Sequence, residues 1–190
     1  MNIPQHGKYK WLPLLYKIVK DFKPKKIIEL GTGRGKTTIT MALVLKELGE
    51  GNIDSYDLWI DKYWGDKEAC LNLFKRWDVD NLISLNHLDF YDWIKLPVED
   101  RNFDILYFDI NNNGTKLLDL YENVKGNIDN GSIVLFEGGS VERDRHGVIV
   151  PGAQKMNDVK DIVGYKVLTK DIKYSFSIIY NDKLHNLEYL

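Results

Sequence analysis

Cysteine is nearly absent from the sequence: Cys70 is the only one among 190 residues. A disulfide within the chain is therefore excluded, and so is a metal site built on a cluster of cysteines. Cys70 falls within a helical pattern, which predicts a small core residue rather than a nucleophile. Free thiols are typical of reducing compartments, so we expect a cytoplasmic location.

Long apolar runs and a large net charge are missing as well. No apolar stretch approaches the roughly 20 residues that a membrane-spanning helix needs. We therefore expect no membrane partner, and we recognise no signal peptide. The formal net charge is -2, so the chain as a whole is not attracted electrostatically to nucleic acid or to an anionic membrane.

Strand and helix patterns alternate along the chain. This alternation predicts an α/β fold with a doubly wound, mostly parallel sheet. The length suits one domain over residues 1–190, with residues 1–24 as an N-terminal helical extension. We expect parallel strands at 27–30, 52–56, 82–85, 103–108 and 131–136, and a closing hairpin at 165–168 and 175–180. Helices are expected at 10–22, 37–48, 67–77, around 117–124 and at 153–162, with a charged loop at 137–146.

A glycine-rich turn follows the first expected strand. Gly31, Gly33 and Gly35 come directly after the apolar residues of that strand, and the next helix begins right after them. Glycines between a strand and a helix bring backbone N–H groups close to a ligand, because no Cβ stands in the way. The sequence therefore predicts that this turn binds the principal ligand.

Two glycine-loop chemistries match this turn only in part. The dinucleotide fingerprint G-x-G-x-x-G needs its third glycine one residue later than Gly35. The phosphate loop G-x-x-x-x-G-K-[ST] finds its second half in Gly35-Lys36-Thr37, but its first glycine would have to be Leu30. The strand that ends at Asp109 supports the phosphate loop, since such a strand holds magnesium in those enzymes.

The pattern E-x-G-x-G-x-G is present in full. It resembles motif I of the class I S-adenosylmethionine-dependent methyltransferases. The resemblance implies a Rossmann-like sheet of seven strands with a C-terminal antiparallel hairpin. It also implies S-adenosylmethionine as the cofactor, with the glycine loop passing beneath its methionine part. The residues expected around that part are Glu29, Gly31, Thr32, Gly33 and Gly35.

Acidic residues follow the next two expected strands. The spacing from Gly35 to Asp57 is close to ~20 residues, the spacing at which an acidic residue of dinucleotide-binding folds forms hydrogen bonds with a ribose diol. A carboxylate accepts hydrogen bonds from both hydroxyls, and Leu58 is a candidate for one face of the base. Asp89 and Phe90 resemble the family's adenine site. A helix N-cap explains Asp89 equally simply.

The next two strand ends supply the candidates for chemistry. Asp109 resembles the acid after the fourth strand of small metal-dependent O-methyltransferases, and we predict that it lies closest to the reaction. Glu137-Gly138 stands where those enzymes have Asp-Asn, so a magnesium site at Asp109 and Glu137 stays open. His146, in the expected charged loop, is a candidate general base or metal ligand, or else a surface residue.

The function expected from these features is transfer of a methyl group from S-adenosylmethionine to a hydroxyl of a small molecule. The fourth strand is followed by Asp109-Ile110-Asn111-Asn112 and not by the Asn/Asp-Pro-Pro-aromatic signature of base-methylating enzymes. A nucleic-acid partner is therefore not expected. Two alternatives stay open: a cofactor- or nucleotide-binding protein of this fold without methyl transfer, and a phosphate-loop nucleotide hydrolase.

Overall fold

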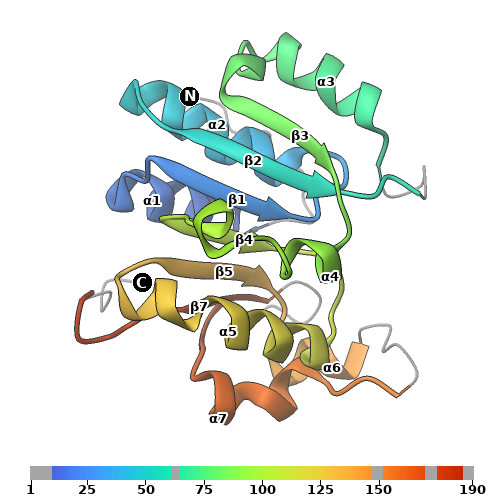
Figure 1. Cartoon of the computed structure of the whole chain (residues 1–190), viewed down its shortest axis with the longest axis vertical. Coiled ribbons are helices and arrows are strands. Elements are labelled where there is room, and N and C mark those ends of the chain that lie inside the picture. Colours follow the sequence, from blue (N-terminus) through green and yellow to red (C-terminus); the bar gives the residue numbers. More distant parts are fainter. Residues whose placement is uncertain (1–9, 61–64, 147–151, 170–174, 186–190) are drawn as a thin grey trace. The chain divides into compact units, whose positions relative to one another are not determined.

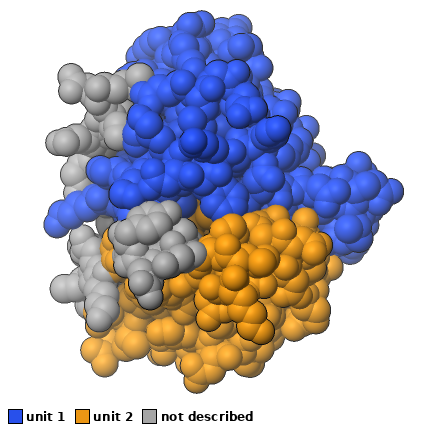
Figure 2. All heavy atoms as spheres, turned by 90° about the vertical axis from the view of Figure 1, so that its left-hand side faces the viewer, with its two compact units in different colours: residues 1–107 blue, residues 108–190 orange. Residues whose placement is uncertain are grey.

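The computed structural model describes residues 10–60, 65–146, 152–169 and 175–185. Residues 1–9 and most of the turn of the closing hairpin lie outside these ranges. The chain divides into two compact units, residues 1–107 and 108–190, which Figure 2 shows in two colours. The single domain over residues 1–190 stays a prediction.

The strands form one seven-stranded sheet in the order β3-β2-β1-β4-β5-β7-β6 (Figure 1). The three strands β1, β2 and β3 pair in parallel. The last strand, β7, runs antiparallel to both β5 and β6. The predicted α/β fold with a C-terminal antiparallel hairpin is confirmed. The strands are β1 (Lys26–Leu30), β2 (Asn52–Asp57), β3 (Ile83–His87), β4 (Ile105–Phe108), β5 (Ile133–Glu137), β6 (Lys166–Thr169) and β7 (Phe176–Ile179).

Seven α-helices and three 3₁₀ turns connect the strands in the described part of the chain. The α-helices are α1 (Leu12–Phe22), α2 (Lys36–Leu48), α3 (Lys67–Arg76), α4 (Phe90–Trp93), α5 (Gly114–Asp129), α6 (Val141–His146) and α7 (Lys160–Val163). The 3₁₀ turns are η1 (Asp80–Leu82), η2 (Val98–Arg101) and η3 (Met156–Val159). The helices expected at 10–22, 37–48 and 67–77 agree with α1, α2 and α3 within a residue or two.

Two expectations for the second unit were wrong. The charged loop expected at 137–146 contains α6, because Ser140 Oγ accepts a hydrogen bond from Arg143 N at 3.0 Å and caps the helix. Asp144, the fourth residue of this helix, is buried and hydrogen-bonded, which its charge does not suggest. The helix expected at 153–162 begins only at Met156, and as the 3₁₀ turn η3.

The core of the first unit fixes the place where the glycine turn begins. Every residue of β1 from Ile27 to Leu30 is buried. The backbone N–H groups of Lys25 and Lys26 donate to Asp104 Oδ2 at 2.7 and 2.9 Å, which fixes the start of β1. Helix α1 packs against α2, the helix that follows the turn. Both ends of the glycine turn are thus anchored in the core.

No helix in the described ranges is both long and apolar enough to cross a membrane.

Candidate functional site

The glycine turn lies between β1 and α2 in a conformation that favours glycine. Gly31, Gly33 and Gly35 have φ angles of 99°, 52° and 72°, a region that residues with a Cβ rarely adopt. A Cβ on Gly35 would lie 2.7 Å from Cε1 of Phe74 in α3. Glycine is therefore required at position 35 for two reasons: the positive φ angle of the backbone, and the close packing of α3 against this position.

Glu29 is fully buried and receives hydrogen bonds from three hydroxyl groups. Thr37 and Thr38, at the start of α2, donate from Oγ1 at 2.6 Å each, and Ser55 on β2 donates from Oγ at 2.5 Å. Thr32 shares a further hydrogen bond with Ser55, with 2.6 Å between their hydroxyl oxygens. The carboxylate predicted to meet the cofactor thus ties together β1, β2 and the start of α2.

The hydroxyl partners of Glu29 were missed by the sequence analysis. Thr37 and Thr38 follow the glycine turn directly, and a buried acid at the end of an apolar strand must find donors nearby. That pair of threonines was the one signal available in the sequence. Ser55 gave none, because its proximity depends on the register between β1 and β2, where it pairs with Glu29.

Asp57 connects the glycine turn to the end of β2. Its Oδ2 accepts a hydrogen bond from Gly33 N at 2.8 Å, and its Oδ1 accepts one from Trp59 N at 2.8 Å. The side chain is half-buried. The structure therefore brings together the predicted ribose-binding acid and the predicted methionine-binding turn.

The predicted adenine residues lie after β2 and β3, whose ends are adjacent. Asp57 and His87 are register partners on these strands, so the residues that follow them share one edge of the sheet. Asp89 is the N-cap of α4 and its Oδ1 accepts from Tyr91 N at 2.8 Å, as the N-cap interpretation predicted. Phe90 is buried, and Leu58 is half-buried.

Cys70 packs against the glycine turn from α3. Its Sγ donates to Gly33 O at 3.3 Å, and a Cβ on Gly65 would lie 2.0 Å from the same oxygen. Burial, with the charges of Glu29 and Asp57, raises the pKa of Cys70 to about 11. The thiol is neutral near pH 7, and the prediction of a core residue is confirmed.

In the second unit, Glu137 at the end of β5 lies beside an arginine, and Asp109 after β4 acts on it electrostatically. Arg143 Nη2 lies 3.3 Å from Glu137 Oε1, and the Glu137 side chain is only 9% exposed. Burial and the negative charge of Asp109 raise the pKa of Glu137 to about 8, while Arg143 opposes the shift. Sequence analysis missed Arg143, because it assigned that segment to a loop.

Two amide oxygens beside this group have no donor among the described residues. Asn111 Oδ1 and Asn112 Oδ1 are both buried. Asn112 is held in place from its other side, since its Nδ2 donates to Asp144 Oδ1 at 2.9 Å. Asp144 in turn accepts from Asn157 N at 2.8 Å. A fixed, buried oxygen of this kind is able to accept a hydrogen bond from a ligand.

The metal and histidine predictions fall on this same unit. In the described ranges, no three His, Cys, Asp or Glu side chains are grouped so as to hold a metal ion. The magnesium site at Asp109 and Glu137 stays a prediction. His146 is the last residue of α6, and its side chain lies outside the described part of the chain, so its role also stays a prediction.

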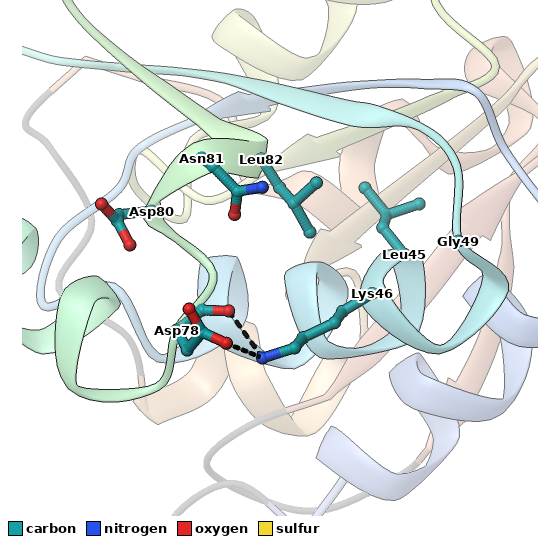
Figure 3. A pocket seen from close by; sticks show the side chains of 7 residues that line it. All are labelled: Leu45, Lys46, Gly49, Asp78, Asp80, Asn81 and Leu82. Carbon is teal, nitrogen blue, oxygen red and sulfur yellow. Dashed lines mark hydrogen bonds and ion pairs between the residues drawn. The ribbon is translucent and has the colours of Figure 1, made fainter.

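A cavity of about 300 Å³ in the first unit lies away from the glycine turn (Figure 3). Its lining comes from the residues that precede β2 and β3, whereas the glycine turn and Asp57 follow the ends of β1 and β2. Lys46 Nζ crosses it to Asp78 Oδ2 at 2.6 Å. The lining residues are Leu45, Lys46, Gly49, Asp78, Asp80, Asn81 and Leu82, and none of them was predicted as a site residue.

Solved structures with this arrangement of elements include several methyltransferases. The O-methyltransferase TomG from Streptomyces achromogenes, in complex with S-adenosylmethionine, is 17% identical with a TM-score of 0.65, over 90% of this chain and 79% of that one. An O-methyltransferase from Bacillus cereus, in complex with S-adenosylhomocysteine, is 15% identical with a TM-score of 0.69, over 95% and 85%. At these identities the likeness shows the fold.

The family itself is shown by a sequence match. No curated protein matches the chain. A family model described as "Methyltransferase domain" matches residues 28–137, which is more than half of the chain and includes the glycine turn and the ends of β2, β3, β4 and β5. The chain therefore belongs to the methyltransferase domain family, as the resemblance at Glu29, Gly31, Gly33 and Gly35 predicted.

Proposed function

We propose that the chain transfers a methyl group from S-adenosylmethionine to a hydroxyl of a small molecule. The observation that carries the proposal is the hydrogen bond from Gly33 N to Asp57, which joins the E-x-G-x-G-x-G turn to the acid after β2. Further support comes from the family match and from the cofactor named for the S. achromogenes enzyme.

The first unit supplies the cofactor-binding residues in this proposal. The glycine turn (Gly31, Thr32, Gly33 and Gly35) lies under the methionine part. Asp57 binds the ribose hydroxyls: an ionised carboxylate has about four lone-pair sites, and the two backbone donors leave sites for them. Leu58, Asp89 and Phe90 flank the adenine. The role of Glu29 is to fix the shape of the glycine turn through its three hydroxyl partners.

The second unit supplies the group that acts on the acceptor. Methyl transfer is an in-line displacement, so catalysis requires that the acceptor oxygen be aligned with the methyl–sulfur bond. Asp109 accepts the proton of the acceptor hydroxyl as that oxygen bonds to the methyl carbon, and the sulfur leaves as a neutral thioether. The buried oxygens of Asn111 and Asn112 favour an acceptor that carries hydrogen-bond donors of its own.

The contacts of Thr37 argue against the phosphate-loop alternative. In a phosphate loop the Ser/Thr hydroxyl that follows the lysine binds magnesium. Here Thr37 Oγ1 donates to the buried carboxylate of Glu29 at 2.6 Å. That hydroxyl would have to leave Glu29 before it could bind a metal ion, and a buried carboxylate would then lose one of its donors.

Isothermal titration calorimetry tests the proposal. We expect the chain to bind S-adenosylmethionine and S-adenosylhomocysteine, and not ATP with magnesium. Asp57→Asn should weaken this binding by about tenfold or more, as expected for a lost charged hydrogen bond. Asp80→Asn, an exposed acid before β3, should leave it unchanged. Binding of magnesium–ATP without any binding of S-adenosylmethionine would reinstate the phosphate-loop hypothesis.

A further inference from the structure

Glu137, the acid at the end of β5, already has a cation of the chain beside it. Arg143 Nη2 lies 3.3 Å from Glu137 Oε1, and both side chains are largely removed from water, at 23% and 9% exposed. A guanidinium stays charged at every accessible pH and holds carboxylates through a planar set of donors. A divalent ion at Glu137 would have to displace it or sit beside it, against its positive charge.

The residue after Glu137 has no room for a ligating side chain. Gly138 has a φ of 120°, and a Cβ there would lie 2.5 Å from Met156 Sδ and 2.6 Å from Asn112 Oδ1. Neither neighbour moves easily: Met156 is fully buried, and Asn112 is held by the buried Asp144. The second oxygen ligand that a metal would need from this position is therefore absent from the sequence and blocked by the packing.

We infer that Arg143 supplies the fixed positive charge at this site and that methyl transfer by this chain needs no divalent metal. The inference rests on the proposed function for its chemistry, but not for its geometry. In this arrangement the guanidinium holds Glu137 and opposes the rise in the pKa of Glu137 that burial and Asp109 cause. Asp109 accepts the proton of the acceptor hydroxyl, as in the proposed function.

The position of Arg143 on a short, capped helix supports a specific role. Its backbone N–H donates to Ser140 Oγ, the cap of α6, at 3.0 Å. Asp144, the next residue, is buried and accepts from Asn112 and from the backbone of Asn157. The backbone of Arg143 is thus anchored on both sides, and its guanidinium lies beside Glu137.

Titration of the full chain with Mn²⁺, followed by electron paramagnetic resonance, tests the inference without any cofactor or acceptor. We expect no saturable binding by the wild type at concentrations up to about 1 mM, the weak end of the range for carboxylate sites. Arg143→Met removes the charge and keeps a flexible chain. It should bind one Mn²⁺ about tenfold more tightly or better, and adding Glu137→Gln should abolish that gain. Arg145→Met, an exposed arginine of the same helix, is the matched control and should behave as the wild type.

Saturable binding of one Mn²⁺ by the wild type, lost in Asp109→Asn, would overturn the inference. An Arg143→Met chain that gains no metal binding would equally overturn the role given to Arg143. If that variant does not fold, the wild-type titration still decides the question, and Arg143→Lys tests the charge with a second cation. Failure of S-adenosylmethionine to bind is a separate result. It would refute the proposed function, but the metal titration could still be interpreted because it uses no cofactor.

Discussion

The acids of the two units differ in what surrounds them. In the first unit, Glu29 and Asp57 accept hydrogen bonds from hydroxyls and backbone N–H groups of the chain itself. In the second unit, Glu137 is buried beside another carboxylate with one arginine nearby, and two amide oxygens close to it accept nothing from the described residues.

This difference distinguishes carboxylates that hold elements of the fold together from a carboxylate that is able to take up a proton. A buried carboxylate with several donors is stabilised in its ionised form and holds the elements that donate to it. A buried carboxylate next to a like charge is poised to take up a proton, and such groups gather where protons are moved. In the proposed function, this difference assigns the cofactor to the first unit and the acceptor to the second.

The largest effect that we predict on stability comes from breaking the first arrangement. Glu29→Ala removes the acceptor of three buried hydroxyls and should lower the free energy of unfolding by about 3 kcal/mol or more, since each hydrogen bond to a charged group contributes about 1.5–3 kcal/mol. Glu47→Ala, which breaks exposed contacts with Tyr16 and Lys20, should cost less than about 1 kcal/mol. Urea denaturation measures both. Equal losses would contradict the structural role of Glu29.

The next effect is expected on the reaction rather than on the fold. Asp109→Asn keeps the shape of the side chain but removes the base, so methyl transfer should fall by roughly 10²-fold or more. The affinity for S-adenosylmethionine and the midpoint of unfolding should change little. Asp129→Asn, at the exposed end of α5, is the control. Near-normal transfer by Asp109→Asn would move attention to His146.

A smaller effect should appear as a pH dependence of stability. The pKa of Glu137 is raised to about 8 in the folded chain, against about 4.3 for an ordinary glutamate. Between these values the folded chain keeps a proton that the unfolded chain has released, so the free energy of unfolding should fall as the pH rises from about 5 to about 8. Glu137→Gln abolishes that titration and should flatten the curve. Parallel curves for the two proteins would show that Glu137 is not so perturbed.

The smallest effect concerns the ion pair at the cavity of Figure 3. Lys46 and Asp78 are 44% and 89% exposed in their side chains, and exposed pairs contribute about 0–1 kcal/mol. Lys46→Ala should therefore lower the free energy of unfolding by less than about 1 kcal/mol. Cofactor affinity, measured by calorimetry, should not change. A clear loss of cofactor affinity would mean that the cavity and the glycine turn are energetically coupled.

The sequence predicted the glycine turn of the first unit better than the surroundings of Glu137 in the second, for physical reasons. The glycine turn combines positive φ angles with an acid at a fixed spacing, and both features are local. The hydroxyls around Glu29 and the pairing of Glu137 with Arg143 depend on register and packing. Helix α6 was missed because its six residues carry charge rather than an apolar period, and its cap, Ser140, resembles any loop serine.

The central claim is that the chain transfers the methyl group and does not merely bind its donor. The most direct test incubates the purified chain with methyl-labelled S-adenosylmethionine and a pool of small metabolites, and measures both S-adenosylhomocysteine and the label. We predict that S-adenosylhomocysteine forms over many turnovers only when the pool is present, and that the label appears in a small molecule as a base-stable methyl ether. Tight binding of S-adenosylmethionine with the methyl group left intact, across chemically varied pools, would contradict the claim and favour a cofactor-binding protein of the same fold.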